Sequence, residues 1–199
     1  ATPDLRTQVL RENIKHVDAV IFTHSHVDHI MGLDDCRRFC AINGHQPLPI
    51  FADQKTMTDL QRVYRYAFES PFIRGYFKPD PNVIDDAFSL GDLQITPFEQ
   101  EHGSMGSLGF LFEQNGNKRL AYYNDCKRVS QPASDAASGV QVAVLDALRP
   151  MEHPSHMTLD EALTAARRIG ASETLLSHLT DFYDHDRDSA DLPDSVIFA

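Results

Sequence analysis

Four strands are predicted from this sequence. After the end of each one comes a histidine or an aspartate, the side chains that commonly bind metal ions. The strands are short apolar or alternating runs at residues 17–22, 93–98, 119–124 and 174–177. The side chains that follow them are His24, His102, Asp125 and His178. In layered α/β proteins the carboxyl ends of the strands form the edge where ligands gather. We therefore predict an α/β fold whose ligand-binding edge carries a metal site.

The segments between these strands predict a single domain over residues 1–199. Helical spacing and capping residues indicate helices over residues 28–40, 53–68 and 158–170, the last one beginning with a Thr158–Glu161 capping box. Further strands are expected at residues 48–52, 108–113 and 140–145. The run Asn115-Gly116-Asn117 marks a hairpin turn. Proline and glycine predict a loop over residues 69–82, which would form part of a lid.

The net charge and the cysteine count disfavour several classes of protein. The net charge is −11, which disfavours long nucleic acid as a partner because like charges repel. Three cysteines, Cys36, Cys40 and Cys126, are too few for a disulfide framework, so we expect reduced thiols in a cytoplasmic protein. No apolar run approaches the roughly 20 residues that span a bilayer, and the first residues do not resemble a signal peptide. We therefore expect no membrane partner.

The segment from His24 to His29 is the densest group of metal-binding side chains. It reads His24-Ser25-His26-Val27-Asp28-His29, which places three imidazoles and a carboxylate in six residues. Imidazole nitrogen and carboxylate oxygen are ligands of zinc, manganese and iron. A short turn at a strand end lets His24 and His26 reach one ion while Asp28 and His29 reach a second. The alternative is a polar loop whose histidines have no common function.

This motif resembles the signature of the metallo-β-lactamase superfamily. The stretch from Thr23 to Asp35 is similar, more specifically, to the cyclic-phosphate phosphodiesterases of the carbon–phosphorus lyase pathway. The similarity continues at Glu101-His102-Gly103, Tyr123-Asn124-Asp125, Pro154-Ser155-His156-Met157-Thr158-Leu159 and Leu176-Ser177-His178-Leu179-Thr180. It implies an αββα sandwich. Because only 23 residues precede the motif and the chain stops at Ala199, we expect this sandwich to lack N-terminal strands and a C-terminal strand.

The resemblance also implies a ligand set for two divalent ions, either zinc or manganese. One ion would be held by His24, His26 and His102, the other by Asp28, His29 and His178, with Asp125 bridging both. Asp181 stands where these relatives place a histidine for a structural zinc, so we expect no structural zinc here. Residues 1–6 resemble the tail of a strand. A second copy of the chain, in a homodimer, would cover the open edge that missing strands leave.

The predicted activity is hydrolysis of a small phosphodiester, such as a cyclic phosphate, by a hydroxide that bridges the two ions. Asp28 would act at the catalytic centre as well as binding metal. His156 is the candidate proton donor or phosphate-orienting residue, and His153 is a weaker candidate. Asp146, at the end of a predicted strand, would hold the free N–H of a ligand histidine. Two ions outweigh two aspartates and a hydroxide, so the site stays positive and attracts a compact anion.

Other functions remain open on the same fold. Thioester hydrolysis is excluded by no residue of the sequence. A tRNA-processing nuclease is the nearest hydrolytic alternative, but the sequence shows no basic arm. Redox members with two irons replace the second histidine of the motif with a carboxylate, which His26 argues against. A non-enzymatic binding module would have lost ligands, and none of the seven is lost.

Overall fold

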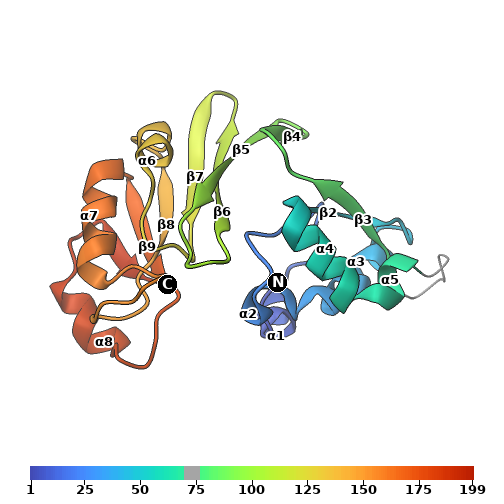
Figure 1. The fold of residues 1–199 in the computed structure, drawn as a ribbon, viewed down its shortest axis with the longest axis horizontal. Coiled ribbons are helices and arrows are strands. Elements are labelled where there is room, and N and C mark those ends of the chain that lie inside the picture. Colours follow the sequence, from blue (N-terminus) through green and yellow to red (C-terminus); the bar gives the residue numbers. More distant parts are fainter. Residues whose placement is uncertain (70–76) are drawn as a thin grey trace. The chain divides into compact units, whose positions relative to one another are not determined.

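The computed structural model describes residues 1–69 and 77–199. Two compact units make up the chain, residues 1–85 and residues 86–199, and each is described by itself (Figure 1). The single domain expected from the sequence stays a prediction.

The first unit contains a parallel sheet with the strand order β1-β2-β3. Its strands are β1 (Val20–Ile21), β2 (Leu48–Ala52) and β3 (Pro79–Val83). β2 is central and alternates between buried and half-buried residues, with Leu48, Ile50 and Ala52 fully enclosed. β1 is much shorter than predicted, because only two of its residues pair with β2. Strand β1 ends directly before the histidine-rich segment.

Helices of the first unit share one hydrophobic core with this sheet. They are α1 (Leu5–Arg11), α2 (Val27–Ile30), η1 (Leu33–Cys36), α3 (Arg37–Ile42), α4 (Gln54–Val63) and α5 (Arg65–Glu69). Residues 1–6 were expected to form a strand tail, and that expectation is wrong. Leu5 and Val9 are four residues apart on α1 and both pack against the core of this unit, which favours a helix.

Two predicted helices are interrupted. The helix expected over residues 28–40 is broken at Gly32, where an added Cβ would lie 2.1 Å from the Thr2 carbonyl oxygen. The helix expected over residues 53–68 does begin with Asp53, which accepts a hydrogen bond from the Thr56 N–H, but it breaks at Tyr64. The Tyr64 hydroxyl donates to the Ile30 carbonyl at 2.7 Å and so ties the end of α4 to the end of α2.

The predicted loop over residues 69–82 is wrong in its last part. Residues 79–83 form β3, which pairs with β2 in parallel. Two prolines are tolerated because β3 is an edge strand of this sheet, where backbone donors are not all needed. Glu69 is the last residue of α5. Residues 70–76 of the predicted lid lie outside the described residues.

The second unit contains a seven-stranded sheet with the order β10-β9-β8-β7-β6-β5-β4. Its strands are β4 (Phe88–Leu90), β5 (Leu93–Gln100), β6 (Ser107–Gln114), β7 (Asn117–Tyr123), β8 (Val142–Asp146), β9 (Glu173–Ser177) and β10 (Val196–Phe198). Strands β4 to β7 pair antiparallel and β7 to β10 pair in parallel. The predicted hairpin between β6 and β7 turns at Asn115 and Gly116, which both have positive φ angles.

Helices α6 (Gln131–Ala136) and α7 (Leu159–Ile169) cover one face of this sheet (Figure 1). The core between them joins Ala162, Ala165 and Ile169 of α7 to Ala143 and Leu145 of β8. The predicted Thr158–Glu161 capping box begins α7, and Gly170 ends it in the left-handed conformation. Two short helices, α8 (His185–Asp188) and η2 (Ser189–Asp191), precede β10. The sequence did not predict α6, α8, η2 or β4.

The last residues of the chain form a strand. β10 continues the large sheet in parallel with β9, although the sequence predicted a sheet without a strand at this end. Val196 and Phe198 are buried in the core of the second unit, while Ile197 is exposed. The absence of further N-terminal strands stays a prediction. Among the described residues, no helix has the length and apolar character needed to cross a bilayer.

Candidate metal centre

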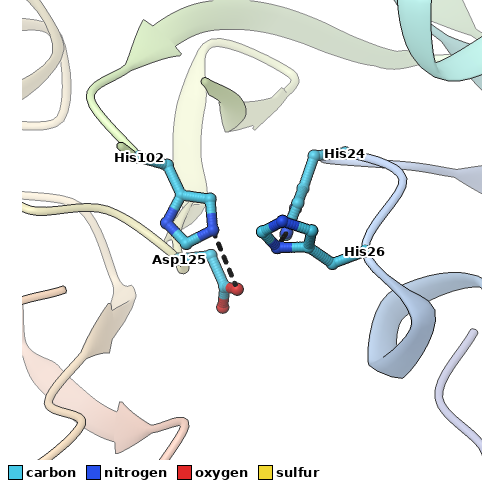
Figure 2. A group of neighbouring side chains, drawn as sticks. All are labelled: His24, His26, His102 and Asp125. Atoms are coloured by element: carbon cyan, nitrogen blue, oxygen red, sulfur yellow. Dashed lines mark hydrogen bonds and ion pairs between the residues drawn. The ribbon is translucent and has the colours of Figure 1, made fainter. Parts of the chain in front are cut away.

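The first unit brings the two leading histidines of the motif together. His24 is almost fully buried just after β1, and His26 is the N-cap residue of α2. The Nε2 atom of His24 lies 2.9 Å from the Nδ1 atom of His26, with the two rings edge to face (Figure 2). Two nitrogens that each bind one zinc ion at about 2.0–2.1 Å are roughly 3 Å apart, so this pair fits a shared ion.

Hydrogen bonds fix this loop from both sides. The Thr23 hydroxyl lies 3.0 Å from Nδ1 of His24, the ring nitrogen on the side away from His26. Ser25, between the two histidines, donates its hydroxyl hydrogen to the Asp59 carboxylate on α4 at 2.6 Å. Partners of this kind hold metal-binding histidines in place.

Asp28 and His29 stand on α2, next to the first pair. An oxygen of Asp28 lies 3.3 Å from Nε2 of His29, and the ring of His29 lies 4.4 Å from that of His24. The Asp28 carboxylate is 59% exposed and the His29 side chain only 14%. Four predicted ligands therefore gather within the first unit, with the aspartate on the open side.

In the second unit His102 follows β5 and is buried. Its Nδ1 atom lies 3.0 Å from the carbonyl oxygen of Ser155. A carbonyl only accepts hydrogen bonds, so Nδ1 carries the hydrogen and Nε2 is left bare for a ligand bond. This bare nitrogen is directed at the Asp125 carboxylate, as the dashed line in Figure 2 shows.

Asp125 lies between two histidines of the same unit. One carboxylate oxygen is 3.2 Å from Nε2 of His178, and the other is 3.9 Å from Nε2 of His102. The carboxylate is only 1% exposed, and the Ser107 hydroxyl donates to the Asp125 carbonyl to hold its backbone. One oxygen faces each histidine, so the carboxylate presents an oxygen on two sides.

Backbone conformation directs two of these side chains. Asp125 has a φ angle of 55° and His178 one of 62°, although neither is glycine. Such left-handed residues are uncommon and cost free energy, so they indicate sites where the chain is shaped for function. Each lies just after a strand, β7 or β9, where a change in φ redirects the side chain out of the strand's own alternation.

Asp146 connects this group to His156. Asp146 ends β8 and is completely buried; one of its oxygens lies 2.5 Å from Nδ1 of His156 and accepts from the Cys126 N–H at 3.1 Å. Its other oxygen accepts from the Leu148 N–H. Nδ1 of His156 therefore carries hydrogen, and Nε2 is the nitrogen available to a substrate or an ion. The sequence expected Asp146 to support a metal ligand, whereas it supports the predicted proton donor.

The ring of His156 stands among the histidines of this unit. It stacks on His178 with centroids 4.8 Å apart and meets His102 edge to face at 4.7 Å. Ligand atoms of Asp125, Asp146, His156 and His178 all lie within 4.8 Å of one another. The donor set is thus imidazole and carboxylate, as zinc or manganese requires, and it fits a divalent ion.

Cysteines take no part in this donor set. Cys36, Cys40 and Cys126 are free thiols, as expected, and all three are buried. Burial raises the pKa of the Cys126 thiol well above its usual value, and the nearby carboxylates of Asp146 and Asp125 raise it further. Both effects favour the neutral form of this thiol, which is packed in the core of the second unit.

Two positioning residues were missed by sequence reasoning. Asp59 lies mid-helix in α4, and no motif of the sequence includes it. Ser155 contributes its backbone carbonyl, which carries no residue-specific signal at all. Only the fold brings Asp59 to Ser25 and Ser155 to His102, over 34 and 53 residues respectively.

A family model described as a beta-lactamase superfamily domain matches residues 1–179. The chain belongs to this superfamily. The match confirms the family predicted from the histidine motif, and with it the metallo-β-lactamase type of mixed α/β fold. The seven-ligand assignment itself stays a prediction.

Solved structures agree with this membership. A structure described as a new diphosphatase from the PhnP family shares 32% identity and a TM-score of 0.85, covering all of this chain and 74% of that one. Human tRNase Z, short form, covers all of this chain and 83% of its own, with 17% identity and a TM-score of 0.72. The second likeness shows a shared fold alone.

Two curated relatives carry different names. The octanoyltransferase of Porphyromonas gingivalis is 30% identical over 187 residues, which are 90% of this chain and 35% of that protein. The exodeoxyribonuclease YycJ of Bacillus anthracis is 25% identical over 141 residues, 70% of this chain and 48% of that protein. The chain thus spans between a third and a half of the length of these relatives.

Proposed function

We propose that this chain is a metal-dependent phosphodiesterase that hydrolyses small phosphodiesters, such as a cyclic phosphate or a diphosphate diester. Two divalent ions, zinc or manganese, would share seven ligands. His24, His26 and His102 would hold one ion and Asp28, His29 and His178 the other, with Asp125 bridging. In layered α/β proteins ligands bind at the carboxyl ends of the strands. Each of the two ligand sets lies at such strand ends within its own unit.

The observation that carries the proposal is the position of Asp125. Its two oxygens face two different histidines, His102 and His178, which the assignment gives to different ions. The bare nitrogen of His102, fixed by the Ser155 carbonyl, supports the same reading because it points at the carboxylate and not at the protein backbone.

Two divalent ions, when bound, lower the pKa of water and polarise a phosphoryl oxygen. The chain's own residues would do the rest. For this step the His156 ring carries hydrogen on both nitrogens. It would give the Nε2 proton to the leaving oxygen as a hydroxide oxygen bonds to phosphorus and the ester P–O bond breaks, and solvent would then return a proton to Nε2. Asp146 keeps hydrogen on Nδ1 of His156, so only Nε2 exchanges a proton with the substrate.

A small substrate agrees with the charge of the chain. The net charge of −11 repels a long polyanion, whereas a compact anion meets mainly the metal site. The PhnP-family relative is described as a diphosphatase, which supports cleavage of a bond to phosphorus. The match to the octanoyltransferase covers only 35% of that protein, so its name need not describe the matched part. We therefore treat acyl transfer as an outcome to be tested.

The test is a set of four substrates given to protein loaded with zinc or manganese. We expect turnover of bis(p-nitrophenyl) phosphate, and negligible turnover of a β-lactam, an octanoyl thioester or single-stranded DNA. Metal analysis should give two ions per chain. Cleavage of the thioester or of DNA without cleavage of the small diester would overturn the proposal.

The role of His156 has its own test. His156→Ala should keep both ions and slow the cleavage of a diester with a poor alkoxide leaving group by about 10²–10⁴-fold. The loss should shrink for p-nitrophenolate, which leaves without a proton. Loss of an ion would identify His156 as a ligand, a role that its closeness to Asp125 and His178 makes the main alternative.

A further inference from the structure

A second histidine in the loop before α7 has a defined hydrogen-bonding role. The Nδ1 atom of His153 accepts a hydrogen bond from the backbone N–H of Ser155 at 3.3 Å. The Ser155 hydroxyl lies 3.3 Å from the same nitrogen. A backbone N–H can only donate, so Nδ1 of His153 must be bare to accept it.

This contact decides where the hydrogen of the His153 ring lies. A neutral imidazole carries one hydrogen, and with Nδ1 bare it must be on Nε2. Burial lowers the pKa of His153, and the neighbouring His156 and Arg149 lower it further, which agrees with a neutral ring. His153 is therefore a neutral donor, and its N–H points away from the Ser155 peptide.

The surrounding loop holds this donor next to the candidate proton donor. The ring of His153 lies 5.0 Å from that of His156. The Ser155 backbone contacts both histidines, since its N–H donates to His153 while its carbonyl accepts from His102. Arg149 shapes the start of the loop by donating to the Met151 and Glu152 carbonyls.

We propose that His153 donates its Nε2–H to a non-bridging oxygen of the substrate's phosphate group and so binds the phosphodiester. The inference rests on the proposed phosphodiesterase function, because it names a further contact to the same substrate. His153 and His156 divide the work. His156, backed by the Asp146 carboxylate, exchanges a proton, whereas His153, backed by a backbone N–H, keeps its hydrogen and only holds the anion.

Two amide substitutions separate the nitrogens of His153. In His153→Asn the side-chain oxygen takes the place of Nδ1, so the Ser155 N–H keeps its acceptor while the donor is lost. In His153→Gln the amide N–H takes the place of Nε2, so the donor is kept. We expect His153→Asn to raise KM for bis(p-nitrophenyl) phosphate about tenfold or more, with kcat little changed, since hydrogen bonds to charged groups are the strong ones. His153→Gln should stay near the wild-type KM.

Other results of this experiment contradict the inference. An unchanged KM in His153→Asn would mean that the Nε2–H does not reach the substrate. A fall in kcat that grows with the basicity of the leaving group would make His153 a proton donor. Equal rises of KM in both variants would point to a role in the shape of the loop.

A second measurement does not depend on turnover. Long-range ¹⁵N–¹H spectra of the metal-free protein report which ring nitrogen carries hydrogen, and we expect the Nε2–H form for His153. Titration of the zinc-loaded protein with inorganic phosphate should then shift the Nε2–H signal of His153. An Nδ1–H form, or a signal that phosphate leaves unmoved, overturns the inference. Wild-type protein that binds phosphate through His153 but cleaves no diester would contradict the proposed function alone.

Discussion

The two units supply metal-binding side chains in different ways. In the first unit His24, His26, Asp28 and His29 come from one segment of six residues, so their closeness follows from the sequence itself. In the second unit His102, Asp125 and His178 follow three different strands, β5, β7 and β9. The first set needs little more than a turn, whereas the second needs a whole sheet in correct register.

The supports of the two sets differ in the same way. The loop of the first unit makes hydroxyl contacts, Ser25 to Asp59 and Thr23 to His24. The second unit contains the completely buried Asp146, which meets His156 and accepts from two backbone N–H groups, one of them next to Asp125. We conclude that substitutions in the second unit should cost more, both in metal binding and in stability. Three predictions test this difference, beginning with the largest effect.

Asp125→Asn should have the largest effect. The amide has nearly the same shape but offers one oxygen in place of two and carries no charge, so it cannot bridge. We expect loss of at least one of two ions by metal analysis and a fall in kcat/KM of at least about 100-fold, the upper end of what losing a supporting partner costs. Asp28→Asn is the matched change in the first unit and should cost less, because that carboxylate is more than half exposed. Equal losses would contradict the comparison.

Asp146→Asn should come second. The amide has one oxygen for the three donors that Asp146 accepts from, and it lacks the charge that favours a proton on His156. We expect kcat for diesters with poor leaving groups to fall about 10- to 100-fold while both ions remain. The free energy of unfolding should fall by about 1–3 kcal/mol, since the carboxylate is completely buried and hydrogen-bonded. Urea unfolding measures the second effect. A variant with the stability and kcat of the wild type would show that the buried contacts of Asp146 contribute to neither.

Asp59→Asn should have the smallest effect of the three. The Ser25 hydroxyl keeps an oxygen to donate to, but loses the charge that shortens this bond to 2.6 Å. We expect the affinity for one ion to weaken by about tenfold, measured by competition with a chelator, with stability nearly unchanged. Ser25→Ala should give a similar loss. A larger loss here than in Asp146→Asn would reverse the ranking of the two units.

The sequence predicted what depends on neighbouring residues. The motif at His24, the hairpin at Asn115 and the capping box at Thr158 are local patterns, and the superfamily and these two elements are confirmed. Local patterns failed where tertiary contacts decide. Leu5 helps α1 to pack on the core where a strand tail was expected, and the prolines of β3 are accepted because that strand lies at an edge.

The candidate site shows the same limit. The predicted ligands could be named from the histidine motif, from positions after strands and from the family resemblance, but their orientations could not. The Ser155 carbonyl, 53 residues away, determines that Nδ1 of His102 carries hydrogen. Asp146, at the end of β8, does the same for Nδ1 of His156. Such contacts leave no trace in local spacing. The distinction between a proton donor and a neutral donor in one short loop therefore requires the structure.

The left-handed backbone at Asp125 and His178 also sets how this protein can be engineered. Glycine and asparagine adopt that conformation more readily than aspartate or histidine do. A redesign that optimises stability alone would therefore favour glycine or asparagine at these two positions, and both replacements remove a proposed ligand. Selection for thermal stability should favour glycine or asparagine at these positions, whereas selection for turnover should favour the aspartate and the histidine. In a directed-evolution experiment, variants that gain heat resistance through either position would be expected to arise as inactive proteins.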